Sequence, residues 1–83
     1  MISTASKAKI IWQCRRGMLE LDLMLNRFVS EHLDELNEQQ VARFEQLLTY
    51  PDPDIYLWLM GSEVPYEQEL IDIVAFIRRH YHI

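Results

Sequence analysis

The sequence predicts an all-α protein, a small bundle of about five helices in a single domain over residues 1–83. Three observations lead to this prediction. Two glycines and three prolines occur in 83 residues, of which 49% are hydrophobic, a composition typical of a compact helical domain. Apolar residues recur at helical spacing in successive segments, and no segment alternates with strand period for long enough to form a sheet. Turn-forming and capping residues fall between these segments.

The first helix is expected to run to about Arg15 or Arg16, where Gly17 interrupts the helical pattern. Its candidate N-caps are Ser3, Thr4 and Ser6, and its predicted apolar side carries Ala8, Ile11 and Trp12. A second helix is expected from about Met18 to Leu36. Its predicted apolar stripe is Leu21, Leu25, Phe28 and Leu36, widened by Met18, Met24 and Val29.

The third helix begins with a capping signal and ends before a proline. Asn37 followed by Gln40 resembles a capping box, in which each residue's side chain bonds the other's backbone N–H. The helix must stop near Tyr50, because Pro51 lacks a backbone donor and restricts the residue before it. The predicted core face is Val41, Phe44, Leu47 and Leu48.

A short fourth helix is predicted in PDPDIYLWLMG. Asp52 suits the N-cap, Pro53 the first helical position and Asp54 the first turn, where the helix dipole favours an acid. Gly61 is expected to close this helix. Its predicted core residues are Ile55, Trp58 and Leu59.

The fifth helix is expected to open at Pro65, with Glu67 and Glu69 in its first turn. Its apolar stripe is Leu70, Ile73, Val74 and Ile77. Arg78 and Arg79 suit its negative C-terminal end. The segment 60–66 matches no functional motif.

The charge distribution excludes some partners and indicates a docking region. A net charge of −5 and a pI near 5.0 argue against general nucleic-acid binding, which needs a basic face. Residues 1–27 nevertheless carry five basic groups against two acidic ones, whereas residues 28–77 carry one against eleven. The N-terminal segment is therefore a small positive island that includes Lys9, Arg15 and Arg16.

The single cysteine and the lack of long apolar runs indicate where in the cell the chain works. Cys14 can form no internal disulfide, which fits a reducing environment. No apolar run approaches the roughly 20 residues needed to span a bilayer, and the N-terminus does not resemble a secretory signal. We expect a cytoplasmic monomer that does not insert into membranes.

No catalytic or metal-binding constellation is evident. Cys14 with His32 lacks a third group, and a lone cysteine in a small domain is expected in the core. His80 and His82 are two apart, so a helix points them to different sides, and His32 is remote in sequence. We therefore predict no metal site and no enzymatic activity.

The two tryptophans sit at helix-stripe positions, where core packing is the default. For Trp58 we predict a buried anchor of the fourth helix. For Trp12 the choice between core and surface stays open, because it adjoins the positive island.

Gly17 raises a specific question, because a glycine inside a helix costs about 0.5–1 kcal/mol relative to alanine. If Gly17 is a junction, Glu20 falls at the third position of the next helix and can bond free amides. Arg16 then stands at the rim of a gap, offering a planar fork of donors to a partner. If the helix continues, Arg16 and Glu20 form an i,i+4 ion pair. The glycine, the arginines and the local charge together favour a docking surface.

The stretch from Trp12 through CRRGMLELD, followed by DPDIYLWL at residues 52–59, resembles the signatures of the SdhE family, also called YgfY or CptB. Its mitochondrial relative is succinate dehydrogenase assembly factor 2. The family's RGxxE motif is present as Arg16, Gly17 and Glu20. The resemblance spans nearly the whole chain in length, order and spacing.

This resemblance implies a five-helix chaperone that assists covalent FAD attachment to the flavoprotein subunit of succinate dehydrogenase, and of fumarate reductase. FAD would be handled on that flavoprotein, whose own histidine forms the bond, and would not be bound tightly by the assembly factor. The implied partner-binding residues are those of the motif, Arg16, Gly17 and Glu20. The positive island and its neighbour add Arg15, Lys9 and Trp12. Asp52, Pro53, Asp54 and Trp58 are expected to be structural.

Two other functions stay open. Members of the family have been labelled antitoxins, which would bind a small membrane-associated toxin or a cytoskeletal partner. A direct FAD carrier would use Arg16 on the pyrophosphate and Trp12 on the ring, although the sequence has no glycine-rich dinucleotide fingerprint.

Overall fold

The computed structural model describes residues 4–81, and in this range five α-helices and one short 3₁₀ helix make up the regular structure. In chain order they are α1 (Thr4–Gln13), α2 (Leu19–His32), η1 (Leu33–Glu35), α3 (Glu38–Leu47), α4 (Asp52–Met60) and α5 (Gln68–Tyr81). The predicted all-α bundle of about five helices is confirmed.

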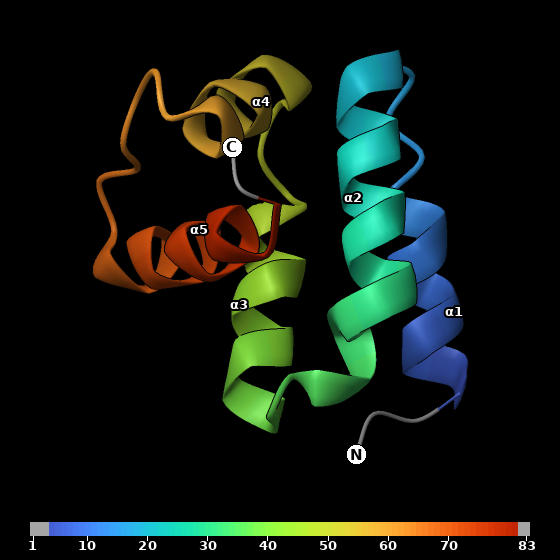
Figure 1. The fold of residues 1–83 in the computed structure, drawn as a ribbon. Helices are drawn as coiled ribbons and strands as arrows, with labels where there is room; N and C mark the ends of the chain where they lie inside the picture. Colours follow the sequence, from blue (N-terminus) through green and yellow to red (C-terminus); the bar gives the residue numbers. More distant parts are fainter. Residues whose placement is uncertain (1–3, 82–83) are drawn as a thin grey trace.

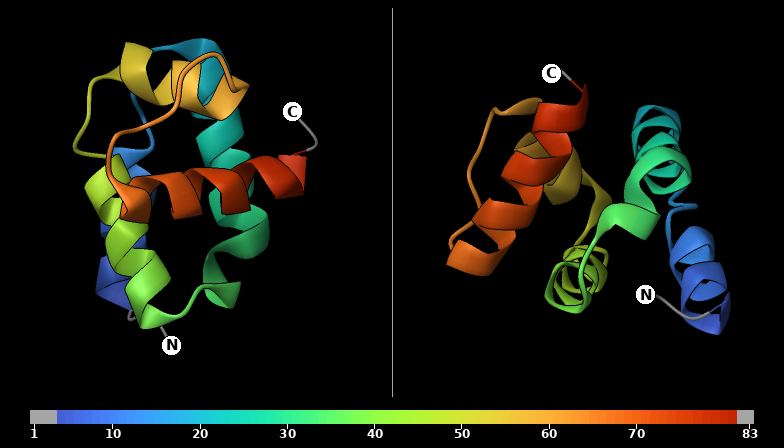
Figure 2. Two further views of the ribbon diagram at one scale, coloured as in Figure 1. Left: turned by 90° about the vertical axis from the view of Figure 1, so that its left-hand side faces the viewer. Right: turned by 60° about the horizontal axis from the view of Figure 1, so that its bottom comes forward.

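Helix α5 lies across the other helices and packs against α2, α3 and α4 (Figure 1). In the left view of Figure 2 it runs across the upright α2 and α3, with α4 above it. Helix α1 lies at one edge of the bundle, beyond α2. The α1–α2 junction and the α3–α4 junction are joined by side-chain hydrogen bonds.

One apolar cluster forms the core and takes residues from every helix. The stripes predicted for the second to fifth helices are confirmed, with Met18, Met24 and Val41 partly buried at the margin of the cluster. Trp58 is buried as predicted, at 9% exposure, and its ring meets Tyr50 edge-on at 5.2 Å between centroids. Leu33 of η1 is a further core residue that the predicted stripe left out.

The apolar side predicted for the first helix is wrong. Ile10 and Cys14 are fully buried, whereas Ile11 is 38% and Trp12 is 70% exposed. Three neighbouring apolar residues at positions 10–12 leave the helical period ambiguous, and tertiary packing selects Ile10. Ser3 lies outside the described residues, while Thr4 and Ser6 are within the helix.

Local signals locate the start of α3 and the end of α4. The Asn37 side chain accepts from Gln40 N at 2.8 Å, and the Gln40 side chain accepts from Asn37 N at 3.0 Å, so the predicted capping box is confirmed. Gly61 closes α4 in the left-handed conformation, with φ of 80°. A Cβ at that position would also lie 2.6 Å from the Arg78 guanidinium.

Two predicted helix starts need correction. Helix α4 has Pro51 as its N-cap and Asp52 as its first residue, so Pro53 is its second residue and not its first. The Asp52 carboxylate accepts from Arg16 Nε. Helix α5 begins at Gln68, not at Pro65. Just before it, the Glu67 carboxylate accepts from Tyr50 Oη at 2.8 Å and from Gln46 Nε2 at 3.1 Å, which ties the entry to α5 onto the end of α3.

Candidate functional site

Gly17 lies in the short connection between α1 and α2, as the junction hypothesis expected. Its φ of 89° is a left-handed conformation that other residues rarely adopt. The backbone N–H groups of Arg16 and Gly17 donate to Asp22 Oδ1 and Oδ2 at 2.7 and 3.2 Å. Asp22 therefore makes the contact with free amides that we expected of Glu20.

The Arg16 side chain is an internal link, with 16% of its surface exposed. Its Nε donates to Asp52 Oδ1 at 2.7 Å. Nη1 donates to Leu48 O at 2.7 Å and to Gln13 O at 3.1 Å, and Nη2 donates to Tyr50 O at 2.8 Å. The expectation that Arg16 stands in solvent at the rim of a gap is wrong, and so is the alternative of an ion pair with Glu20.

These four contacts, which we call the Arg16 latch, hold three parts of the fold together. Leu48 and Tyr50 follow the end of α3, where helix carbonyls lack intrahelical partners and favour a positive charge. Asp52 opens α4. The latch therefore joins the RGxxE motif to the DPD segment.

The start of α2 presents an exposed edge, which we define as Gly17, Leu19, Glu20 and Leu23. No described atom beyond the neighbouring residues lies within 4 Å of a Cβ built on Gly17. Leu19 and Leu23 are 69% and 63% exposed and lie one helical turn apart on the side away from the core stripe. Glu20 is exposed and has no hydrogen bond or ion pair within residues 4–81.

Sequence reasoning missed Leu19 and Leu23, although a signal was available. Leu21, Leu25 and Phe28 already define the core stripe of this helix, so leucines two positions out of phase must face elsewhere. Large exposed apolar residues next to a charged group are typical of a protein-binding surface.

The other predicted partner-binding residues lie on α1 and just after it. Lys9 and Arg15 are exposed. The Arg15 guanidinium lies 5.8 Å from the centroid of the Trp12 ring, an exposed cation–π contact. Trp12 is thus a surface residue, which decides the choice between core and surface that the sequence left open.

Cys14 is not available as a nucleophile. Burial raises the pKa of its thiol to about 12, opposed in part by the positive charge of Arg16 and assisted by Asp22. The thiolate is therefore absent near neutral pH, and Cys14 serves as a small apolar residue of the core.

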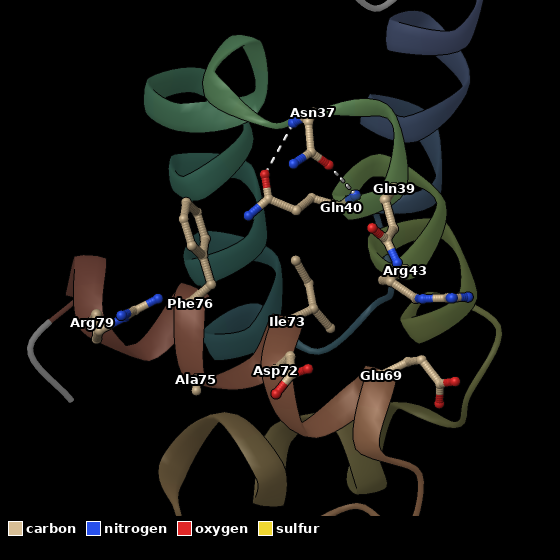
Figure 3. Close-up of a pocket in the computed structure, with 10 residues that line it drawn as sticks. All are labelled: Asn37, Gln39, Gln40, Arg43, Glu69, Asp72, Ile73, Ala75, Phe76 and Arg79. Carbon is tan, nitrogen blue, oxygen red and sulfur yellow. Dashed lines mark hydrogen bonds between the residues drawn. The ribbon is translucent and has the colours of Figure 1, made fainter.

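A groove of about 580 Å³ lies between α3 and α5 (Figure 3). It mixes Arg43 and Arg79 with Glu69 and Asp72, and Phe76 stands at one side of it. None of the predicted partner-binding residues lines it. The groove is therefore a surface separate from the exposed edge.

Fold and site define a small all-helical protein in which one short motif supplies both an internal latch and an exposed edge. Within residues 4–81, no helix is long and apolar enough to cross a membrane. The chain belongs to the family described as "Flavinator of succinate dehydrogenase" (Sdh5), whose pattern it matches over residues 8–81. The resemblance noted from the sequence is thereby confirmed.

Several curated relatives carry the name "FAD assembly factor SdhE". The chain is 54% identical to the one from Legionella pneumophila (strain Lens) over 72 residues, covering 87% of this chain and 90% of the relative. It is 47% identical to the Coxiella burnetii protein over 75 residues, covering 90% of each. It is 44% identical to the Idiomarina loihiensis protein over 71 residues, covering 86% of this chain and 79% of the relative.

Proposed function

We propose that this chain is an assembly factor that binds the flavoprotein subunit of succinate dehydrogenase and promotes its covalent attachment of FAD. The observation that carries the proposal is its membership, over residues 8–81, of a family described as a flavinator of that enzyme. The chain acts as a chaperone and not as an enzyme, so bond formation is left to groups on the flavoprotein.

The geometry supports a division of labour within the RGxxE motif. Arg16 fixes the connection between α1 and α2 against the start of α4. That fixed backbone presents Gly17, Leu19, Glu20 and Leu23 to the partner, with Lys9, Arg15 and Trp12 as further contacts. A pre-formed edge binds with less loss of conformational entropy than a mobile loop.

The proposal extends to the cofactor, the clients and the place of action. FAD is held by the flavoprotein, because this chain carries no glycine-rich loop for a pyrophosphate. The flavoprotein subunit of fumarate reductase is a second partner, to which the chain likewise promotes covalent FAD attachment. The chain acts as a monomer in the cytoplasm. The reducing conditions there fit its free, buried Cys14.

Glu20→Ala should lower covalent flavin on the flavoprotein about tenfold, the effect of losing roughly 1.4 kcal/mol at a central interface contact. Thermal stability should stay within about 0.5 kcal/mol of wild type, because Glu20 is exposed. The measurement is in-gel flavin fluorescence of the flavoprotein subunit in a strain that lacks its own assembly factor, beside melts of the purified variants.

Glu38→Ala is the matched control, since Glu38 is also an exposed acid in the first turn of a helix. It should support normal flavin attachment. Equal flavin attachment by Glu20→Ala and Glu38→Ala would show that Glu20 is not part of the interface. A toxin co-purifying in place of the flavoprotein would favour the antitoxin alternative, and a yellow isolated protein would favour the carrier.

A further inference from the structure

His32, Glu35 and His80 come together where the end of α2 and the η1 turn meet the last turn of α5. One ligand atom from each residue lies within 4.8 Å of the other two. This cluster could not be predicted from the sequence, because only folding brings His80 beside His32. His82, the other histidine of the C-terminal segment, lies outside the described residues.

Aromatic packing holds the two imidazoles in place. The rings of His32 and His80 lie 4.2 Å apart between centroids. The Phe76 ring lies 4.4 Å from that of His80, and the buried Phe28 ring lies 5.7 Å from that of His32. Side chains fixed in this way lose little further freedom when they bind a ligand.

Hydrogen bonds determine which histidine nitrogens carry a proton. His80 Nδ1 lies 2.8 Å from Phe76 O, and a carbonyl can only accept, so Nδ1 donates and Nε2 keeps its lone pair in the neutral ring. His32 Nδ1 similarly donates to Glu35 Oε2 at 2.5 Å. A backbone carbonyl that orients one nitrogen and frees the other is the usual outer partner of a metal-binding histidine.

We propose that His32, Glu35 and His80 form a binding site for a divalent transition metal, with Zn²⁺ as the ion that suits them best. Two imidazoles and one carboxylate are a known three-ligand zinc set, which leaves a fourth position for water. Nitrogen ligands select against Mg²⁺ and Ca²⁺, which prefer oxygen alone. The metal takes the place of the proton between His32 Nδ1 and Glu35. A neutral His32 ring then carries its proton on Nε2, whereas a doubly protonated ring releases one proton to solvent.

The required movement is small. Zinc bonds of about 2.0–2.2 Å place tetrahedral ligand atoms roughly 3.3 Å apart. Ligand atoms that now lie up to 4.8 Å apart must therefore close by at most about 1.5 Å, whereas His32 Nδ1 and Glu35 Oε2, now at 2.5 Å, must separate by about 0.8 Å. Rotation of the exposed Glu35 side chain, with small shifts of the two rings, can supply this. Binding would fasten the last turn of α5 to the α2–η1 corner, and this consequence is independent of flavin attachment.

The test is a Zn²⁺ titration of the chelator-treated full chain. We expect one ion per chain and a melting temperature raised by about 10 °C or more at a hundredfold excess over Kd. Mg²⁺ should have no effect. The ¹⁵N chemical shifts of the His32 and His80 imidazoles should move on addition of Zn²⁺.

Glu35→Gln and His80→Gln should each weaken Zn²⁺ binding at least tenfold, as expected for a lost ligand. Glu31→Gln is the control, because Glu31 is an exposed acid of the same region that pairs with Arg27 at 2.9 Å. It should bind Zn²⁺ like wild type. Failure of wild type to bind Zn²⁺, or undiminished binding by folded His80→Gln and Glu35→Gln, would overturn the proposal.

Discussion

Arg16→Ala should lower the free energy of unfolding by about 2–4 kcal/mol, a large share of the roughly 4–12 kcal/mol expected for a domain of this size. The substitution leaves Asp52 without its cation and the carbonyls of Leu48 and Tyr50 without their donor. A loss of about 2–4 kcal/mol corresponds to a melting temperature lower by roughly 10–25 °C. Calorimetry or circular dichroism melts of the purified variant measure it.

Arg16→Lys is the informative control, because lysine keeps the charge but not the planar fork of donors. It should fall between wild type and Arg16→Ala. A double-mutant cycle with Asp52→Asn should give a coupling of about 0.5–3 kcal/mol. An Arg16→Ala melting temperature within about 2 °C of wild type, well under the shift for 1 kcal/mol, would contradict the latch.

The latch changes how mutants of the RGxxE motif must be interpreted. Loss of flavin attachment by Arg16→Ala does not by itself assign Arg16 to the interface, because the same change loosens the backbone of the exposed edge. Glu20 has no such structural role among the described residues. We therefore expect variants of Glu20 to report on the partner and variants of Arg16 to report on the fold.

Trp58→Ala should cost about 3–5 kcal/mol, the range for removing a large aromatic side chain from a core. Trp58 is buried and meets Tyr50 edge-on. It belongs to the same core cluster as the apolar stripe of α5. Trp12→Ala is the matched control, since Trp12 is 70% exposed and its removal should change stability by less than about 0.5 kcal/mol.

Denaturant melts of the two tryptophan variants measure this difference directly. The tryptophan that remains also reports on its surroundings, so emission from Trp12→Ala should arise from a buried ring and emission from Trp58→Ala from a solvated one. Equal stability of the two variants would show that Trp58 does not anchor the core.

Local signals in the sequence predicted most of the fold. Asn37 and Gln40 interact within one helical turn, and Gly61 ends α4 through its own backbone conformation, so both are determined by near neighbours. The stripe of α5 is equally local, because one face of the helix carries Leu70, Ile73 and Ile77. Patterns of this kind need no knowledge of distant residues.

The candidate site could be predicted only in part, because its main contacts are long-range. Arg16 was expected in solvent since it lies in a basic run, and nothing in the sequence shows that carbonyls at the end of α3 will surround it. The same limit applies to His32 and His80. Resemblance singled out the motif residues as a group but could not separate the latch from the exposed edge.

The most direct test of the central claim is reconstitution of flavin attachment from purified components. The flavoprotein subunit of succinate dehydrogenase, prepared without flavin from a strain lacking the assembly factor, is incubated with FAD in the presence or absence of this chain. Denaturing gels then report covalent flavin by its fluorescence over time. We predict that the chain accelerates attachment severalfold while remaining colourless itself. Equal rates with and without the folded chain would contradict its role as a flavin assembly factor.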